Sequence, residues 1–165
     1  MKKMETISSI SSLTLCNKGG NCKIISIREE QETLLSELLQ RNHFQPRNDN
    51  NGPYALQLSI EDARLILRIQ NALNQDLSAL VLSLKPYRRL IQDYFLMLQS
   101  YEQARQHATR EKLESIDMAR RALHNEGAEL LIERLKDKID IDFETARKLF
   151  TLICVLHKTD MQLMR

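Results

Sequence analysis

The sequence predicts an α+β domain, in which a small, mainly antiparallel sheet of about four strands packs against three long C-terminal helices. Apolar and polar residues alternate over residues 54–84, and apolar residues recur at helical spacing after Pro86. The length of 165 residues fits a single domain. We therefore expect a disordered N-terminal tail at residues 1–20 and one folded α+β domain at residues 21–160.

The first half is predicted to contain the strands and one short helix. Residues 22–27 are β-branched and short, which favours a strand, and residues 28–42 carry leucines at helical spacing. Residues 45–53 combine two prolines, a glycine and several Asn or Asp residues, which is typical of a loop. Three antiparallel strands are expected at residues 54–60, 64–70 and 77–84, because period-two patterning is broken there only by short turns. The strand after the loop, or the first strand, is expected at a sheet edge that could pair across a homodimer.

The second half is predicted to be helical. Pro86 suits the first turn of a helix, and the apolar residues after it form one face. A second helix is expected over residues 112–136 and a third near residues 140–157. Asp142 is the predicted N-cap of the third helix. Residues 149–156 are apolar nearly all round, so this helix should be central and buried.

Composition and cysteine usage narrow the class of protein. With 24 basic and 22 acidic residues the net charge is +2, which does not indicate nucleic-acid or membrane binding through bulk charge. The absence of Trp leaves little material for stacking bases, so nucleic acid is a weakly supported partner. The three cysteines form no zinc pattern, and polar residues interrupt the N-terminus too often for a signal peptide. These features favour a cytoplasmic protein without a membrane span, metal or cofactor.

One stretch, "DMARRALHNEG" at residues 117–127, places polar residues on or beside the apolar face of the second helix. On a helical wheel Arg120 falls inside the apolar arc, while Asp117 and His124 lie at its edge within reach of Arg120. One interpretation is an internal ion pair between Arg120 and Asp117. The other is an anion pocket, in which Arg120 holds a phosphate or carboxylate and His124 supplies a hydrogen bond. Gly127 costs roughly 1 kcal/mol against Ala in a helix, so close packing or close ligand approach is expected there.

A second basic cluster lies at the start of the first long helix, in "KPYRRLIQDYF" at residues 85–95. A helix N-terminus with basic side chains can bind anions, although Arg89 is expected to pair with Asp93 at i+4. The sequence contains no phosphate-binding glycine loop, HExxH or GxSxG motif. The predicted ligand-binding residues are Arg88, Asp117, Arg120, Arg121, His124 and Asn125.

Four long strings carry a resemblance to a known family. They are "NGPYALQLSIEDARLIL", "LSLKPYRRLIQDYFLMLQSYEQA", "IDMARRALHNEGAELLIERL" and "IDFETARKLFTLICVLH". Together they resemble a family of small alphaproteobacterial proteins, uncharacterised protein family zero-two-six-two, over residues 23–157. The resemblance implies a bacterial cytoplasmic protein and no activity, substrate or cofactor.

Two classes of function follow from the residues. The first is a non-catalytic binding or regulatory module whose partner is a small anionic ligand or a protein. The second is a small enzyme, with His124 as general acid/base and Arg120 as anion stabiliser. Convergence of Arg88, Arg120 and His124 on one open pocket would support a ligand-binding or active site, whereas internal pairing of Arg120 with Asp117 would indicate a structural network.

Overall fold

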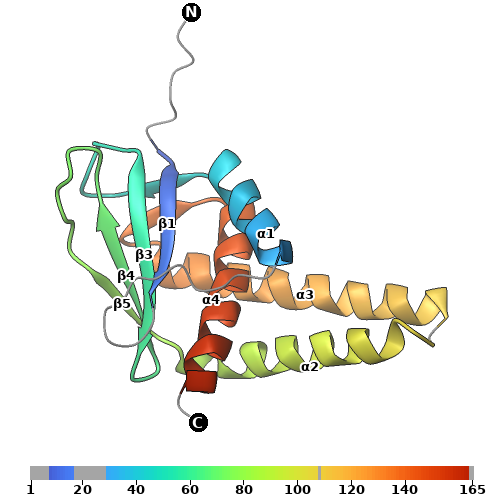
Figure 1. The fold of residues 1–165 in the computed structure, drawn as a ribbon. Helices are drawn as coiled ribbons and strands as arrows, with labels where there is room; N and C mark the ends of the chain where they lie inside the picture. The colour runs from blue at the N-terminus through green and yellow to red at the C-terminus, as the bar shows by residue number, and fades with distance from the viewer. Residues whose placement is uncertain (1–7, 17–28, 108, 164–165) are drawn as a thin grey trace, which may run out of the picture.

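The structure is a computed structural model that describes residues 8–16, 29–107 and 109–163. It is an α+β fold in which helices cover one face of a four-stranded sheet (Figure 1). The sheet has the order β1-β3-β4-β5 and comprises β1 (Ile10–Cys16), β3 (Tyr54–Glu61), β4 (Arg64–Gln70) and β5 (Leu80–Ser83). The helices are α1 (Glu29–Gln40), α2 (Arg88–Ala104), α3 (Arg110–Leu135) and α4 (Phe143–Leu163).

The main sheet is mixed rather than wholly antiparallel. Strand β1 pairs in parallel with β3, while β3 with β4 and β4 with β5 are antiparallel, as the alternation predicted. The turn from β3 to β4 passes through Asp62 and Ala63, both with positive φ, which is the backbone of a tight hairpin turn. Strand β3 lies between β1 and β4, so of the two strands expected at an edge the one after the loop is internal. The other, predicted at residues 22–27, falls outside the described residues, and the edge position before β3 is taken by β1. Pairing across a homodimer stays a prediction.

The prediction of a disordered tail is corrected for residues 10–16, because these residues form β1. The register of β1 shifts between Ile10 and Ser12, so its buried residues, which are Ile10, Leu13, Leu15 and Cys16, do not alternate strictly with exposed ones. The three polar residues between Ile10 and Leu15 and this irregularity hid the period-two pattern of the strand. The strand predicted at residues 22–27 falls outside the described residues.

A second, two-stranded sheet joins distant parts of the chain. Strand β2 (Phe44–Pro46) pairs antiparallel with β6 (Ile139–Ile141). Beside it, the backbone N–H of His43 donates to Thr145 Oγ1 over 3.0 Å. These bonds tie the segment after α1 to the start of α4. Strands of three residues carry too little pattern to be found from sequence.

The predicted helices are confirmed, with small shifts of their ends. A 3-10 helix, η1 (Lys85–Tyr87), carries Pro86 and leads directly into α2. Asp142 Oδ1 accepts from the backbone N–H of Thr145 over 2.8 Å, so Asp142 is the N-cap of α4. Helices α2 and α3 pack side by side and extend beyond the rest of the molecule as a helical arm (Figure 1).

Helix α4 is central and buried, as its apolar run predicted. Phe150, Leu152 and Ile153 are almost fully enclosed between the sheet and the other helices. Cys154 is a free, buried thiol whose pKa is raised by burial. Cys16, by contrast, is disulfide-bonded, so cysteine usage does not support the prediction of a reducing compartment. None of the described helices is both long and apolar enough to cross a lipid bilayer.

The Asn-rich loop is held in place by a polar network. The buried Asn71 donates from Nδ2 to Asp49 Oδ1 over 3.1 Å and to Gln75 Oε1 over 2.9 Å, while its Oδ1 accepts two backbone N–H groups. Burial raises the pKa of Asp49, but hydrogen bonds from Asn51, Asn71 and Tyr54 outweigh it and leave the pKa below its usual value. The loop is therefore docked on the β4–β5 connection.

Candidate functional site

Asp117 is the centre of an ion-pair network on the surface of α3. Its carboxylate accepts from Arg120 over 2.7 Å and 3.1 Å, and Arg121 Nε lies 3.1 Å from its second oxygen. The hydrogen bond from Arg120 lowers the pKa of Asp117, in opposition to a small effect of burial. Internal pairing was one of the two interpretations of this stretch, and the structure contains that pair.

Arg120 is not buried, contrary to its place on the helical wheel. Its side chain is 46% exposed. The stripe that α3 buries begins at Leu123 and continues through Gly127 and Leu131. Arg120 lies about one turn before Leu123, the first residue of α3 that is buried. A helical wheel shows which face of the helix a residue occupies. It does not show along which part of the helix that face is covered by other elements.

His124 is the residue of this stretch that the core encloses. It is 9% exposed and lies between two aromatic rings, with centroid distances of 5.5 Å to Tyr94 and 6.4 Å to Phe150. Burial, helped by the charges of Arg120 and Arg147, lowers the pKa of His124 to about 4, so the ring is neutral at pH 7. Its Nε2 has no hydrogen-bond partner among the described residues. This enclosed position favours a packing role over general acid/base chemistry.

Gly127 follows His124 on the same buried stripe, and its role is close packing. A Cβ built at Gly127 would lie 2.5–2.6 Å from three ring atoms of Phe150. The ring of Phe150 is fully buried. The sequence left two explanations for this glycine, close packing or close approach of a ligand. The contact with Phe150 of α4 supports close packing.

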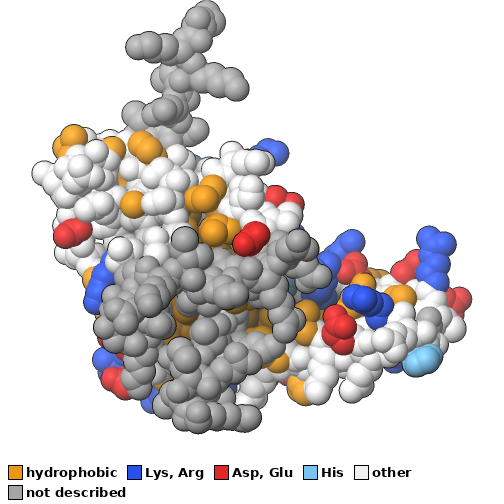
Figure 2. Space-filling model, viewed as in Figure 1, with side chains coloured by type: hydrophobic (Ala, Val, Ile, Leu, Met, Phe, Trp, Pro, Cys, Tyr) orange, Lys and Arg blue, Asp and Glu red, His pale blue; other side chains and the backbone are white. Residues whose placement is uncertain are grey.

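Within the described residues, Asn125 of the predicted set and Arg89 of the second basic cluster show no converging site. Asn125 is exposed on α3. Arg89 pairs with Asp93 over 3.5 Å, which confirms the expected i+4 pair, and also with Glu126 over 2.7 Å, which links α2 to α3. Figure 2 shows basic and acidic side chains interspersed along the arm rather than gathered into a patch of one sign. No group of metal-ligating side chains occurs in the described parts of the chain.

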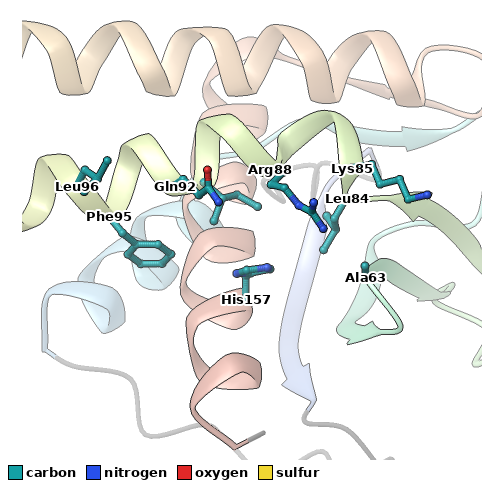
Figure 3. Close-up of a pocket in the computed structure, with 9 residues that line it drawn as sticks. Ala63, Leu84, Lys85, Arg88, Gln92, Phe95, Leu96 and His157 are labelled. Atoms are coloured by element: carbon teal, nitrogen blue, oxygen red, sulfur yellow. The ribbon is translucent and has the colours of Figure 1, made fainter. Parts of the chain in front are cut away.

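A cavity of about 660 Å³ lies elsewhere, between α2, the end of α4 and the β3–β4 turn (Figure 3). Its described lining combines apolar side chains with four polar ones. The residues are Ala63, Leu84, Lys85, Arg88, Ile91, Gln92, Phe95, Leu96 and His157. A volume of this size is typical of small-molecule sites, in which an apolar wall carries a few polar groups.

Local structure explains how the basic end of the cavity is built. The backbone N–H of Leu84 donates to the carbonyl of Ala63 over 3.0 Å, so the β3–β4 turn is held against the end of β5. Pro86 in η1 then starts the helix, which brings Lys85 and Arg88 to the same end of the cavity. In Figure 3 Arg88 extends from α2 toward the space beside His157, whereas Lys85 extends away along the rim.

Lys85 and Arg88 are exposed cations that have no acidic partner among the described residues. Within the described part of the chain, neither side chain takes part in an ion pair, whereas the adjacent Arg89 has two acidic partners. An arginine of this kind can form a two-pronged hydrogen bond to a carboxylate or phosphate. The arrangement can therefore hold an anion at one end of an apolar cavity.

Of the predicted binding residues, only Arg88 lines this cavity. Arg88 does not converge there with Arg120 or His124. Sequence reasoning missed Gln92 and His157. Arg88, Gln92 and Leu96 are spaced at i, i+4 and therefore lie on one face of α2. This spacing is the pattern from which the side of α2 that lines the cavity could be predicted. No local pattern marks His157 as a wall of the cavity, because nothing in the sequence places α4 across from α2.

The chain is similar to the proteins of one family. The model of the uncharacterised protein family UPF0262 matches residues 8–159, which include β1. A UPF0262 protein of Brucella anthropi is 47% identical over 79% of this chain and 82% of its own. One of Agrobacterium fabrum is 44% identical over 79% and 83%, and one of Paramagnetospirillum magneticum is 43% identical over 90% and 94%. No solved structure matches significantly.

Proposed function

We propose, from the premise that this chain belongs to the uncharacterised protein family UPF0262, that it is a non-catalytic binding protein for a small anionic ligand. The ligand would occupy the cavity between α2 and α4, with its negative charge at Arg88 and Lys85. The observation that carries the proposal is this pair of cations, unpaired among the described residues, at the end of a cavity of about 660 Å³. A cytoplasmic location and a protein partner stay predictions.

Two physical arguments support an anionic ligand over a neutral one. Arg88 extends into the cavity, and Lys85, three residues earlier on η1, adds positive charge at the rim of the same end. The apolar side chains of Leu84 and Ile91 line the cavity beside Arg88, and apolar surroundings lower the local dielectric, which strengthens the attraction between a guanidinium and a bound anion. A neutral ligand would leave both charges without compensation.

The test compares two adjacent arginines. Wild type, Arg88→Gln and Arg89→Gln are titrated calorimetrically at about 0.15 M salt, where exposed charges are largely screened, with phosphate, acetate, octanoate and octyl phosphate, and with octylammonium as a cationic control. Both substitutions remove one positive charge from α2, so they have the same effect on net charge. Arg88 lines the cavity, whereas Arg89 pairs with Asp93 and Glu126 outside it.

We expect at least one anion to bind the wild type, and the cation not to bind. Loss of a charge-assisted hydrogen bond should raise Kd about tenfold to a hundredfold in Arg88→Gln. Arg89→Gln should stay within about twofold of wild type, because a distant exposed charge is screened. The proposal is wrong if no anion binds the folded wild type, or if both variants weaken binding equally.

A further inference from the structure

The cavity has a basic end and an apolar end, arranged along α2. Lys85 and Arg88 lie at the start of η1 and α2, whereas Phe95 and Leu96 lie about two turns later (Figure 3). Ile91 and Gln92 line the stretch between them. At about 1.5 Å per residue, Arg88 and Leu96 are roughly 12 Å apart along the helix axis. A ligand that uses both ends must be elongated.

The apolar end carries hydrophobic surface that the protein does not cover. Leu96 is 61% exposed although it lines the cavity. Phe95 is half-buried, and its ring packs edge-on against Tyr94 with a centroid distance of 5.5 Å. This contact holds the Phe95 ring in position beside the cavity. Apolar surface beside a cavity is typical of a site that a ligand completes.

We propose that the ligand is an amphiphile, with an unbranched apolar chain that ends in a carboxylate or phosphate. This inference rests on the proposed function and adds the ligand class to it. The head group binds Arg88 with help from Lys85, and the chain lies along Ile91 and Phe95 to Leu96. Charge complementarity sets the direction of the chain, because among the described lining residues the lysine and the arginine both lie at the end near Arg88.

Two other classes of anion fit this cavity less well. A compact anion such as phosphate or acetate would occupy the basic end and leave the walls at Phe95 and Leu96 bare. A nucleotide gains affinity from stacking of its base, and Phe95 is the one aromatic side chain in the described lining. Burial of methylene groups, by contrast, uses every apolar residue of the wall.

A chain-length series tests the ligand class. Acetate, butyrate, hexanoate, octanoate and decanoate are titrated into the wild-type protein at constant ionic strength, below the concentrations at which they aggregate. Full burial of one methylene group corresponds to about fourfold in Kd. We therefore expect affinity to rise about fourfold per added carbon and then to level off once the chain passes Leu96. Octyl phosphate against octanoate distinguishes the two head groups.

Leu96→Ser should weaken octanoate about threefold to tenfold and leave acetate unchanged, because only the longer chain reaches this residue. Leu98→Ser is the matched control, since Leu98 is an exposed leucine of the same helix that is absent from the described lining. Equal affinities for acetate and octanoate, or equal effects of the two leucine variants, would overturn the inference and leave the anion site standing. Absence of binding by every anion would overturn both proposals.

Discussion

Replacement of Gly127 by alanine tests whether the contact between α3 and α4 sets the residue at this position. A Cβ at Gly127 would meet Phe150 Cδ1 at 2.5 Å, and the ring or the helix must move by about 1 Å to restore ordinary contact. Phe150 is fully buried, so its ring has no free space in which to move. We expect Gly127→Ala to destabilise the protein.

Two opposing effects determine the magnitude. Alanine is favoured over glycine inside a helix by about 1 kcal/mol. Overpacking of a tight core costs about 1–3 kcal/mol, and three ring atoms within 2.6 Å place this site at the upper end. The net loss in the free energy of unfolding is about 2 kcal/mol, which corresponds to a Tm lower by about 4–8 °C.

Urea denaturation followed by circular dichroism measures this loss. Ala122→Gly, at an exposed position of α3, provides the control for helix propensity and should cost about 1 kcal/mol. In a Phe150→Leu background the flat ring is gone, so Gly127→Ala should become neutral or stabilising, with a coupling of about 1–3 kcal/mol. A Gly127→Ala protein more stable than wild type would refute the steric argument, because propensity alone gives that sign.

Three further predictions concern stability. The pKa of His124 is lowered to about 4 in the folded state, so protons bind the unfolded state first as pH falls below 6.5. Wild type should therefore lose about 2 kcal/mol more than His124→Leu between pH 7 and pH 5 in urea denaturation, and identical pH profiles would contradict this. Asn71→Ala should cost about 2 kcal/mol, because it leaves the donors and acceptors around its buried amide unpaired, while the exposed Asn50→Ala should cost almost nothing. Asp142→Ala should cost about 1 kcal/mol by thermal melting through loss of the N-cap of α4, and restored stability in Asp142→Ser would confirm that cause.

The sequence predicted those parts of the fold in which a local pattern repeats. The hairpin of β3 and β4 and the buried run of α4 each display a periodicity over seven or more residues, and both are confirmed. Strands β2 and β6 are three residues long, and the irregular register of β1 breaks its alternation. Such elements depend on partners far away in the chain, which one sequence does not identify.

The candidate site was harder to predict for a related reason. Arg88 and Arg120 are both arginines beside an apolar helix face, and their local sequences do not distinguish them. The difference lies in what the fold brings to each: Asp117 neutralises Arg120 on the same helix, whereas α4 and the β3–β4 turn give Arg88 a cavity and no acidic partner among the described residues. A cation is a candidate for ligand binding when it lines a cavity and has no acidic partner among the described residues. Arg88→Gln, with Arg89→Gln as its matched control, is therefore the decisive comparison for this protein.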